Sequence, residues 1–253
     1  MTLKKYDFLL ILLLGLTQPI FAAFENLVLQ DYLHSSFHDN PAQSYVYCGS
    51  LNFPSFKYLN QYELGFSFPL GKTNLGGHLF TSGDQLYRES MVRVHANRTL
   101  IQRLSYGIKV SGYQIRVENY GSASTWSVGF SSQLALHDDI QLIVDYDNLL
   151  FLGSANINED IPRRGMVTLK SHTLENQTFI YKMEKEIPHV VNHHVYWKSL
   201  LRPSLSILGG FTSNPQTFIG GGQFEKGKMQ VSVGMIYHPV LMTSVGLRLA
   251  YRL

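Results

Sequence analysis

The chain has 253 residues, of which 15% are charged and 13% aromatic, and its formal net charge is +3. Because this positive charge is small and dispersed, it argues against nucleic acid as a partner. The single cysteine, Cys48, excludes a disulfide framework within the chain and a paired-cysteine metal site.

The N-terminus predicts a secretory signal peptide over residues 1–22. Lys4 and Lys5 precede an apolar run at residues 8–16, and small residues follow, so we expect cleavage after Ala22. The run is too short to span about 30 Å of hydrocarbon, which disfavours an uncleaved anchor. Residues 23–43 contain a stretch with one apolar side that suits a short plug or cap ahead of the main domain, residues 44–253.

The main domain alternates between strand patterns and polar turns almost throughout. No later stretch reaches eighteen apolar residues, so no transmembrane helix is expected. Alternating patterns predict these strands: 45–49, 62–68, 75–81, 91–97, 104–117, 126–136, 140–147, 167–169, 179–184, 191–198, 205–211, 218–224, 229–237 and 243–253. If the protein lies in a membrane, the sheet must close. The prediction is an all-β fold, a transmembrane antiparallel up-and-down β-barrel of about 14 strands.

Two irregular points interrupt this pattern. The apolar alternation of 104–110 resumes one residue out of phase after Gly112, which predicts a β-bulge at that glycine. Residues 149–164 are rich in Asn, acidic residues and Pro, and this composition predicts the longest surface loop.

The last strand has one continuous apolar face. Thr243, Val245, Leu247, Leu249, Tyr251 and Leu253 share that face, and Arg248 and Arg252 lie on the other. Such a terminal strand is typical of outer-membrane barrels, in which the assembly machinery reads it. We therefore assign an insertion signal to Leu247, Leu249, Tyr251 and Leu253, although the usual last residue is Phe or Trp.

Several charged residues lie opposite apolar strand faces. A charge facing lipid costs about 2–4 kcal/mol at the membrane midplane, so these residues should face the lumen. The candidates are Asp145, Asp147, Lys182, Glu184, Lys198, Arg248 and Arg252. They either line a polar path, hold a plug, or fill the interior as cross-strand ion pairs, and we favour the last.

Ten histidines invite a search for chemistry. His193 and His194 are adjacent, so a strand points them to opposite faces and they cannot chelate one ion together. His34 and His38 could share a helical face but lack a carboxylate at ligand spacing. No GxSxG motif is present. The sequence therefore predicts no catalytic residues, no metal site and no cofactor.

Short segments resemble FadL-like outer-membrane barrels, and most of all the PorV/PorQ-type branch. The Asn-Pro-Ala segment at 40–42 resembles the one that opens the first strand in that branch. Further similar segments are 68–71, 76–77, 111–118, 209–221, 237–239 and 249–253. The glycine-rich stretch that normally precedes Asn-Pro-Ala is degraded here, and the chain is shorter than typical members. The resemblance implies a 14-stranded barrel.

Function follows less directly, because a fold does not fix it. The expectation is a non-enzymatic PorV/PorQ-type barrel in a Gram-negative outer membrane, used in transport or secretion. Alternatives are a FadL-like transporter of fatty acids or other hydrophobic compounds, a membrane-embedded hydrolase, and a secreted soluble β-sandwich. Expected partners are outer-membrane lipid, the barrel-assembly machinery, and either secretion-system components or a hydrophobic ligand.

Overall fold

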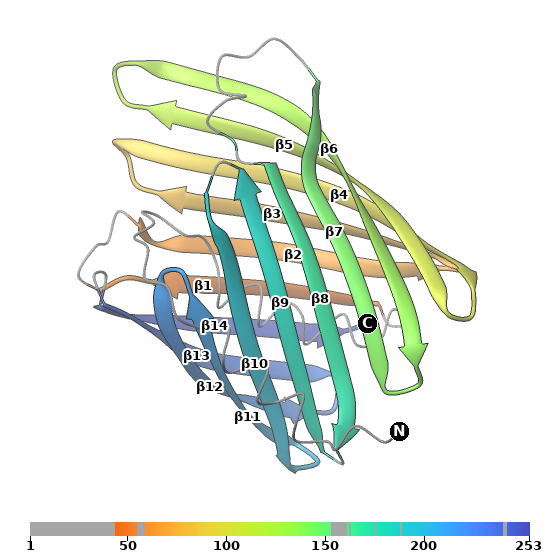
Figure 1. The fold of residues 1–253 in the computed structure, drawn as a ribbon. Coiled ribbons are helices and arrows are strands. Elements are labelled where there is room, and N and C mark those ends of the chain that lie inside the picture. Colours follow the sequence, from red (N-terminus) through yellow and green to blue (C-terminus); the bar gives the residue numbers. More distant parts are fainter. Residues whose placement is uncertain are drawn as a thin grey trace.

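The computed structural model describes residues 44–54, 59–152, 161, 163–174, 176–187, 189–239 and 242–253. In this part of the chain, fourteen antiparallel strands form one closed barrel (Figure 1). Each strand pairs with its neighbours in the chain, and orange β1 pairs with blue β14 to close the ring. The predicted fold class is confirmed. The predicted signal peptide and the plug segment, residues 1–22 and 23–43, lie outside the described residues.

The strands are between eight and seventeen residues long. They are β1 (Tyr45–Asn52), β2 (Gln61–Leu70), β3 (Thr73–Gly83), β4 (Tyr87–Ile101), β5 (Leu104–Val117), β6 (Gly121–His137), β7 (Ile140–Leu152), β8 (Arg163–Leu174), β9 (Gln177–Ile187), β10 (Val191–Arg202), β11 (Leu205–Ser213), β12 (Gln216–Lys226), β13 (Met229–His238) and β14 (Met242–Arg252).

The closing pair joins the first and last strands over the whole of β1. Its register runs from Tyr45 opposite Arg252 to Asn52 opposite Val245. Every backbone group along this seam therefore has a partner strand, as a sheet in hydrocarbon requires. A closed ring also contradicts the β-sandwich alternative, because a sandwich needs two sheets that face each other across a core.

Alternation sorts the side chains into an outer apolar face and an inner polar face. On β14, Leu249 is 40% exposed and Arg248 is 1% exposed. The same contrast holds on β2, where Leu64 and Phe66 are exposed and Glu63 is buried. The exposed apolar stripe therefore lies outside the barrel, where lipid would cover it.

The two ends of the barrel differ in the length of their connections. Short turns at residues 71–72, 102–103, 138–139, 203–204 and 227–228 lie at the same end as Tyr45 and Arg252. At the other end, the gaps in the chain between β1 and β2 and between β7 and β8 are longer. Among the described residues, no helix is long and apolar enough to cross a membrane.

Two irregularities predicted from the sequence differ from the structure. The pairing of β5 with β4 and β6 runs through Gly112 without a register shift, so the apolar residues beyond it turn inward without a bulge. The predicted loop 149–164 is shorter than expected, because β7 continues to Leu152 along Trp126 and Val128, and β8 begins at Arg163. A pronounced irregularity lies in β7, opposite Gly129 of β6.

Candidate functional site: the barrel interior

The irregularity in β7 places two neighbouring side chains inside the barrel. Val128 of β6 pairs with Leu150, but Phe130 pairs with Tyr146, so three residues of β7 oppose Gly129 alone. Asn148, in the middle of the three, has a positive φ of 60°. Any Cβ at residue 129 would collide with the carbonyl oxygen of Tyr146, so only glycine fits there. Asp147 and Asn148 are consequently both buried, which an uninterrupted strand does not allow.

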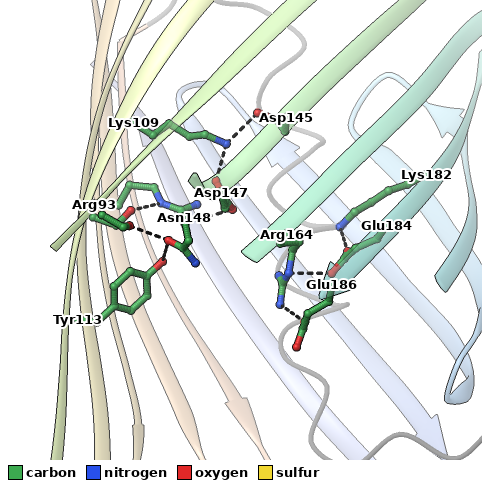
Figure 2. Close-up of polar contacts among 12 residues, drawn as sticks. Arg93, Lys109, Tyr113, Asp145, Asp147, Asn148, Arg164, Lys182, Glu184 and Glu186 are labelled. Atoms are coloured by element: carbon green, nitrogen blue, oxygen red, sulfur yellow. Dashed lines mark hydrogen bonds and ion pairs between the residues drawn. The ribbon is translucent and has the colours of Figure 1, made fainter. Parts of the chain in front are cut away.

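Asp147 is the centre of a buried ionic network (Figure 2). Its carboxylate lies 2.6 Å from Lys109 Nζ and 3.2 Å from a terminal nitrogen of Arg93. Lys109 also donates to Asp145 at 2.9 Å. Two cations from β4 and β5 thus converge on two carboxylates of β7.

The long reach of these cations depends on the strand between them. The inward positions of β6 near the network are Ser127, Gly129 and Ser131, all small. Lys109 can therefore extend across β6 to β7, and Arg93 extends from β4 while donating to Ser111 on the way. Asn148 accepts hydrogen bonds from Ser127 at 2.7 Å and, as Figure 2 shows, from Tyr113 at 2.9 Å.

A second part of the network joins β8, β9 and β10. Arg164 lies 2.9 Å from Glu184 and 3.2 Å from Glu186 (Figure 2). Glu184 also lies 2.8 Å from Lys182, and 3.5 Å from His194. We call the two parts together the charged belt, defined by Arg93, Lys109, Asp145, Asp147, Arg164, Lys182, Glu184 and Glu186.

A separate cluster lies where the barrel closes. Arg248 of β14 stacks on the ring of Tyr47 from β1, with 3.8 Å between the guanidinium carbon and the ring centroid. Glu63 of β2 lies 3.7 Å from Arg248 and 3.2 Å from His78. Because Gly65 has no side chain, the ring of Tyr47 can lie across it. This Glu63 cluster therefore connects β1, β2, β3 and β14 inside the closing seam.

The remaining candidates lie nearer the short turns. Lys198 donates to Gln223 at 3.4 Å, and Arg252 donates to Glu225 at 2.9 Å. All seven charged residues that alternation assigned to the lumen thus lie on the inner face of their strands. The belt unites Asp145 with Asp147 and Lys182 with Glu184, while Lys198, Arg248 and Arg252 belong to other groups.

The interior also contains a hydrophobic cluster, which we call the apolar lining. It connects the start of the β1–β2 connection with the inner faces of β9 to β13. Its members are Leu51, Phe53, Leu59, Ile180, Tyr196, Leu208, Ile219 and Ile236. One part of the inner wall is therefore apolar, although a water-filled barrel is polar inside.

Several members of these networks were missed by sequence reasoning. Lys109 and Arg93 alternate with apolar residues, as Asp145 does. The same alternation could therefore have assigned both to the lumen. Arg164 fell inside the predicted loop, and no pattern marked Asn148, because its inward position depends on the buckle opposite Gly129.

The structure places two of the histidines considered for metal binding on opposite faces of β10. His194 points inward toward Glu184 and Tyr196, whereas His193 bonds the exposed side of β9 through Tyr181. His34 and His38 lie outside the described residues. Within the described ranges, no three His, Cys, Asp or Glu side chains form a group able to hold a metal ion.

No protein-family model and no curated protein matches this chain. Its fold does match solved structures. It is similar to the CymD monoaromatic hydrocarbon channel with a TM-score of 0.61 and 9% identity, over 86% of this chain and 92% of that chain. It is similar to the Pseudomonas putida toluene transporter TodX with a TM-score of 0.60 and 9% identity, over 86% and 93% of the two chains. At such low identity, the likeness shows a shared barrel fold.

Proposed function

We propose that this protein is a non-enzymatic outer-membrane barrel that binds and passes small hydrophobic compounds. The apolar lining carries the proposal, because a hydrophobic compound needs an apolar surface inside an otherwise polar barrel. The shared fold with two hydrocarbon channels supports it. It corresponds to the FadL-like alternative from the sequence.

The outer-membrane location is part of the same proposal. The apolar outer face fits lipid, and the short turns at the end where β1 begins and β14 ends fit the periplasmic side of such barrels. Leu247, Leu249, Tyr251 and Leu253 lie on the outer face of β14 or just beyond its end, all exposed, where an insertion machine could bind them. Their role as an insertion signal remains a prediction.

Binding of a radiolabelled hydrocarbon tests the proposal directly. The full-length protein in nanodiscs is dialysed to equilibrium against toluene or oleate, and binding to empty nanodiscs is subtracted. Leu208→Ala removes apolar surface from the lining and should weaken binding about tenfold. Ile207→Ala is the matched control, because its neighbour Leu208 is 5% exposed and Ile207, on the outer face, is 36% exposed.

Two results would contradict the proposal. Toluene and oleate bound no better than in empty nanodiscs would remove the basis for a hydrophobic cargo. An equal loss in Leu208→Ala and Ile207→Ala would mean that the signal comes from lipid around the barrel.

A secretion-associated barrel is the second candidate. It is favoured by the PorV/PorQ-like segments, of which 68–71, 209–221 and 249–253 lie in the described strands and turns. Affinity purification from the native outer membrane separates the two candidates. Stoichiometric recovery of other secretion components supports this second role, and recovery of the barrel alone with bound hydrophobic compounds supports the first.

A further inference from the structure

The outer face of β4, β5 and β6 has an ordered sequence of residue types. Successive register rows across β4, β5 and β6 contain Val94, Val110 and Val128, then Val92, Gly112 and Trp126, then Ser90, Gln114 and Ser124. In the row beyond these, Arg88 pairs with Arg116, which pairs with Ser122. The face therefore changes from apolar through aromatic and polar to cationic as it approaches the end with long connections.

Both arginines point outward with the apolar residues. The β4–β5 register is unbroken from Tyr87 to Thr99, so Arg88 has the same facing as Val92 and Val94, which are exposed. By the same alternation, Arg116 faces outward with Ile108 and Val110. Both arginine side chains are exposed.

Direct opposition of two cations across an antiparallel pair is unfavourable by itself. Side chains paired in this way have Cβ atoms about 4.5–5.5 Å apart, and like charges there destabilise the sheet. Neither guanidinium group forms a hydrogen bond or ion pair with any other residue in the described ranges. A bound anion would remove the repulsion, and a phosphate accepts paired hydrogen bonds from guanidinium groups.

The nearby carboxylates do not pair with these two arginines. Asp84 accepts hydrogen bonds from the backbone of Leu86 and Tyr87, and Glu89, on the inner side, accepts one from Tyr87. Glu118 lies two residues beyond Arg116, in the turn. In the described ranges, therefore, neither guanidinium group has a carboxylate partner.

The position along the strand selects a lipid headgroup as the source of the anion. Trp126 is exposed on the outer face, with its ring over Gly112, and exposed aromatic residues are enriched at membrane interfaces. Val92 lies in the same register row as Gly112, and Arg88 is four residues farther along β4. For a tilted strand, this separation corresponds to about 10 Å in height. Headgroup phosphates lie just outside the hydrocarbon at about this level.

We propose that Arg88 and Arg116 form a docking site on the outer wall for the phosphate groups of a lipid in the outer leaflet. This site uses the outer-membrane location proposed above and is independent of transport. The lipid would bind as an annular partner of the β4–β5 wall, with its acyl chains on Val92, Val94 and Val110.

The test measures lipid retained by the full-length protein. Nanodiscs contain phosphatidylcholine with either doubly phosphorylated lipid A or the same lipid after removal of its phosphates, and native mass spectrometry counts the glycolipid kept on the barrel after transfer to detergent. The double variant Arg88→Gln/Arg116→Gln should retain about tenfold less phosphorylated lipid, since two charge-assisted hydrogen-bonding groups are lost.

Arg98→Gln is the matched control. Arg98 is exposed on the same outer face of β4, opposite Tyr106, but toward the other end of the strand. It should retain phosphorylated lipid as the unmodified protein does. Equal retention by the double variant and the unmodified protein overturns the proposal, as does equal retention of the dephosphorylated lipid. Toluene binding by the double variant should stay unchanged, which separates this test from that of transport.

Discussion

The barrel has one kind of outer face but two kinds of interior. From β4 to β9 the inner wall holds the charged belt, in which Asp147 and Glu184 each serve two cations. From β9 to β13, together with Leu51 and Phe53, it holds the apolar lining. Lipid contact requires the same apolar stripe on every strand, whereas the interior is free to differ from side to side.

This contrast assigns barrel stability to the charged belt and the proposed cargo binding to the apolar lining. Ion pairs buried in a barrel fix the relative positions of strands that are not neighbours, as Arg93 and Asp147 do across β5 and β6. Apolar side chains fix less, but they give a hydrophobic compound a surface on which it can displace water. We therefore expect substitutions in the charged belt to change stability and those in the apolar lining to change binding.

The largest effect is expected from Asp147→Ala. It leaves the buried Lys109 and the half-buried Arg93 with one carboxylate fewer, and breaking a buried pair costs about 3–5 kcal/mol. Urea unfolding from lipid vesicles measures the loss. Asp145→Asn is the control, since its side chain is 26% exposed and Lys109 keeps Asp147. If both variants unfold at the same urea concentration, the belt does not stabilise this side of the barrel.

The second-largest effect on stability is expected from a charge placed on the outer face. Leu249→Lys places an ammonium group toward lipid and should cost about 2–4 kcal/mol near the membrane midplane. Leu253→Lys, at the end of the same face, should cost about 0–1 kcal/mol. Refolding into vesicles without assembly machinery measures both, separately from any insertion signal. An equal cost at the two positions would show that β14 does not cross the hydrocarbon in the proposed way.

Gly129→Ala tests the buckle that brings Asp147 and Asn148 inside. The new Cβ collides with the carbonyl oxygen of Tyr146, and a forced shift of this kind costs about 1–3 kcal/mol. Gly220→Ala adds the same atom on β12 with nothing within 4 Å of it. Thermal unfolding of both variants should separate them, and a Gly129→Ala protein as stable as the unmodified one would mean that β7 can straighten.

The smallest effect concerns the Glu63 cluster, which lies at the seam between the two interiors. Tyr47→Leu removes the ring under Arg248 and should cost about 1–2 kcal/mol, the range of a desolvated cation–π contact. Tyr47→Phe keeps the ring and should cost less. Urea midpoints compare the two variants, and a larger loss in Tyr47→Phe would shift the role from the ring to the hydroxyl group.

Sequence reasoning predicted the strands well because facing is a local property. Lipid outside forces apolar residues onto every second position, so Val245, Leu247 and Leu249 identify β14 without any knowledge of its neighbours. The same rule assigned Asp145 and Lys182 to the interior.

Contacts across the interior, in contrast, depend on residues that are far apart in the chain. The reach of Lys109 to Asp147 depends on small residues of β6, and the position of Asn148 depends on Gly129, nineteen residues earlier in the chain but adjacent in the sheet. At Gly112 the apolar pattern changes phase although the strand register does not, because the apolar residues beyond it face inward. A change of pattern within a strand therefore does not by itself predict a bulge. The apolar lining gathers residues from β1, from the connection after it and from β9 to β13, and it has no signature within any one strand.

Cys48 offers the most direct test of the barrel in its membrane. It is the only cysteine of the chain, lies on the outer face of β1 between Leu64 and Leu249, and is exposed. A bimane label attached there before refolding into vesicles should be quenched by brominated acyl chains and protected from aqueous iodide. Quenching by iodide alone would show that this face does not contact lipid and would contradict the membrane-spanning barrel.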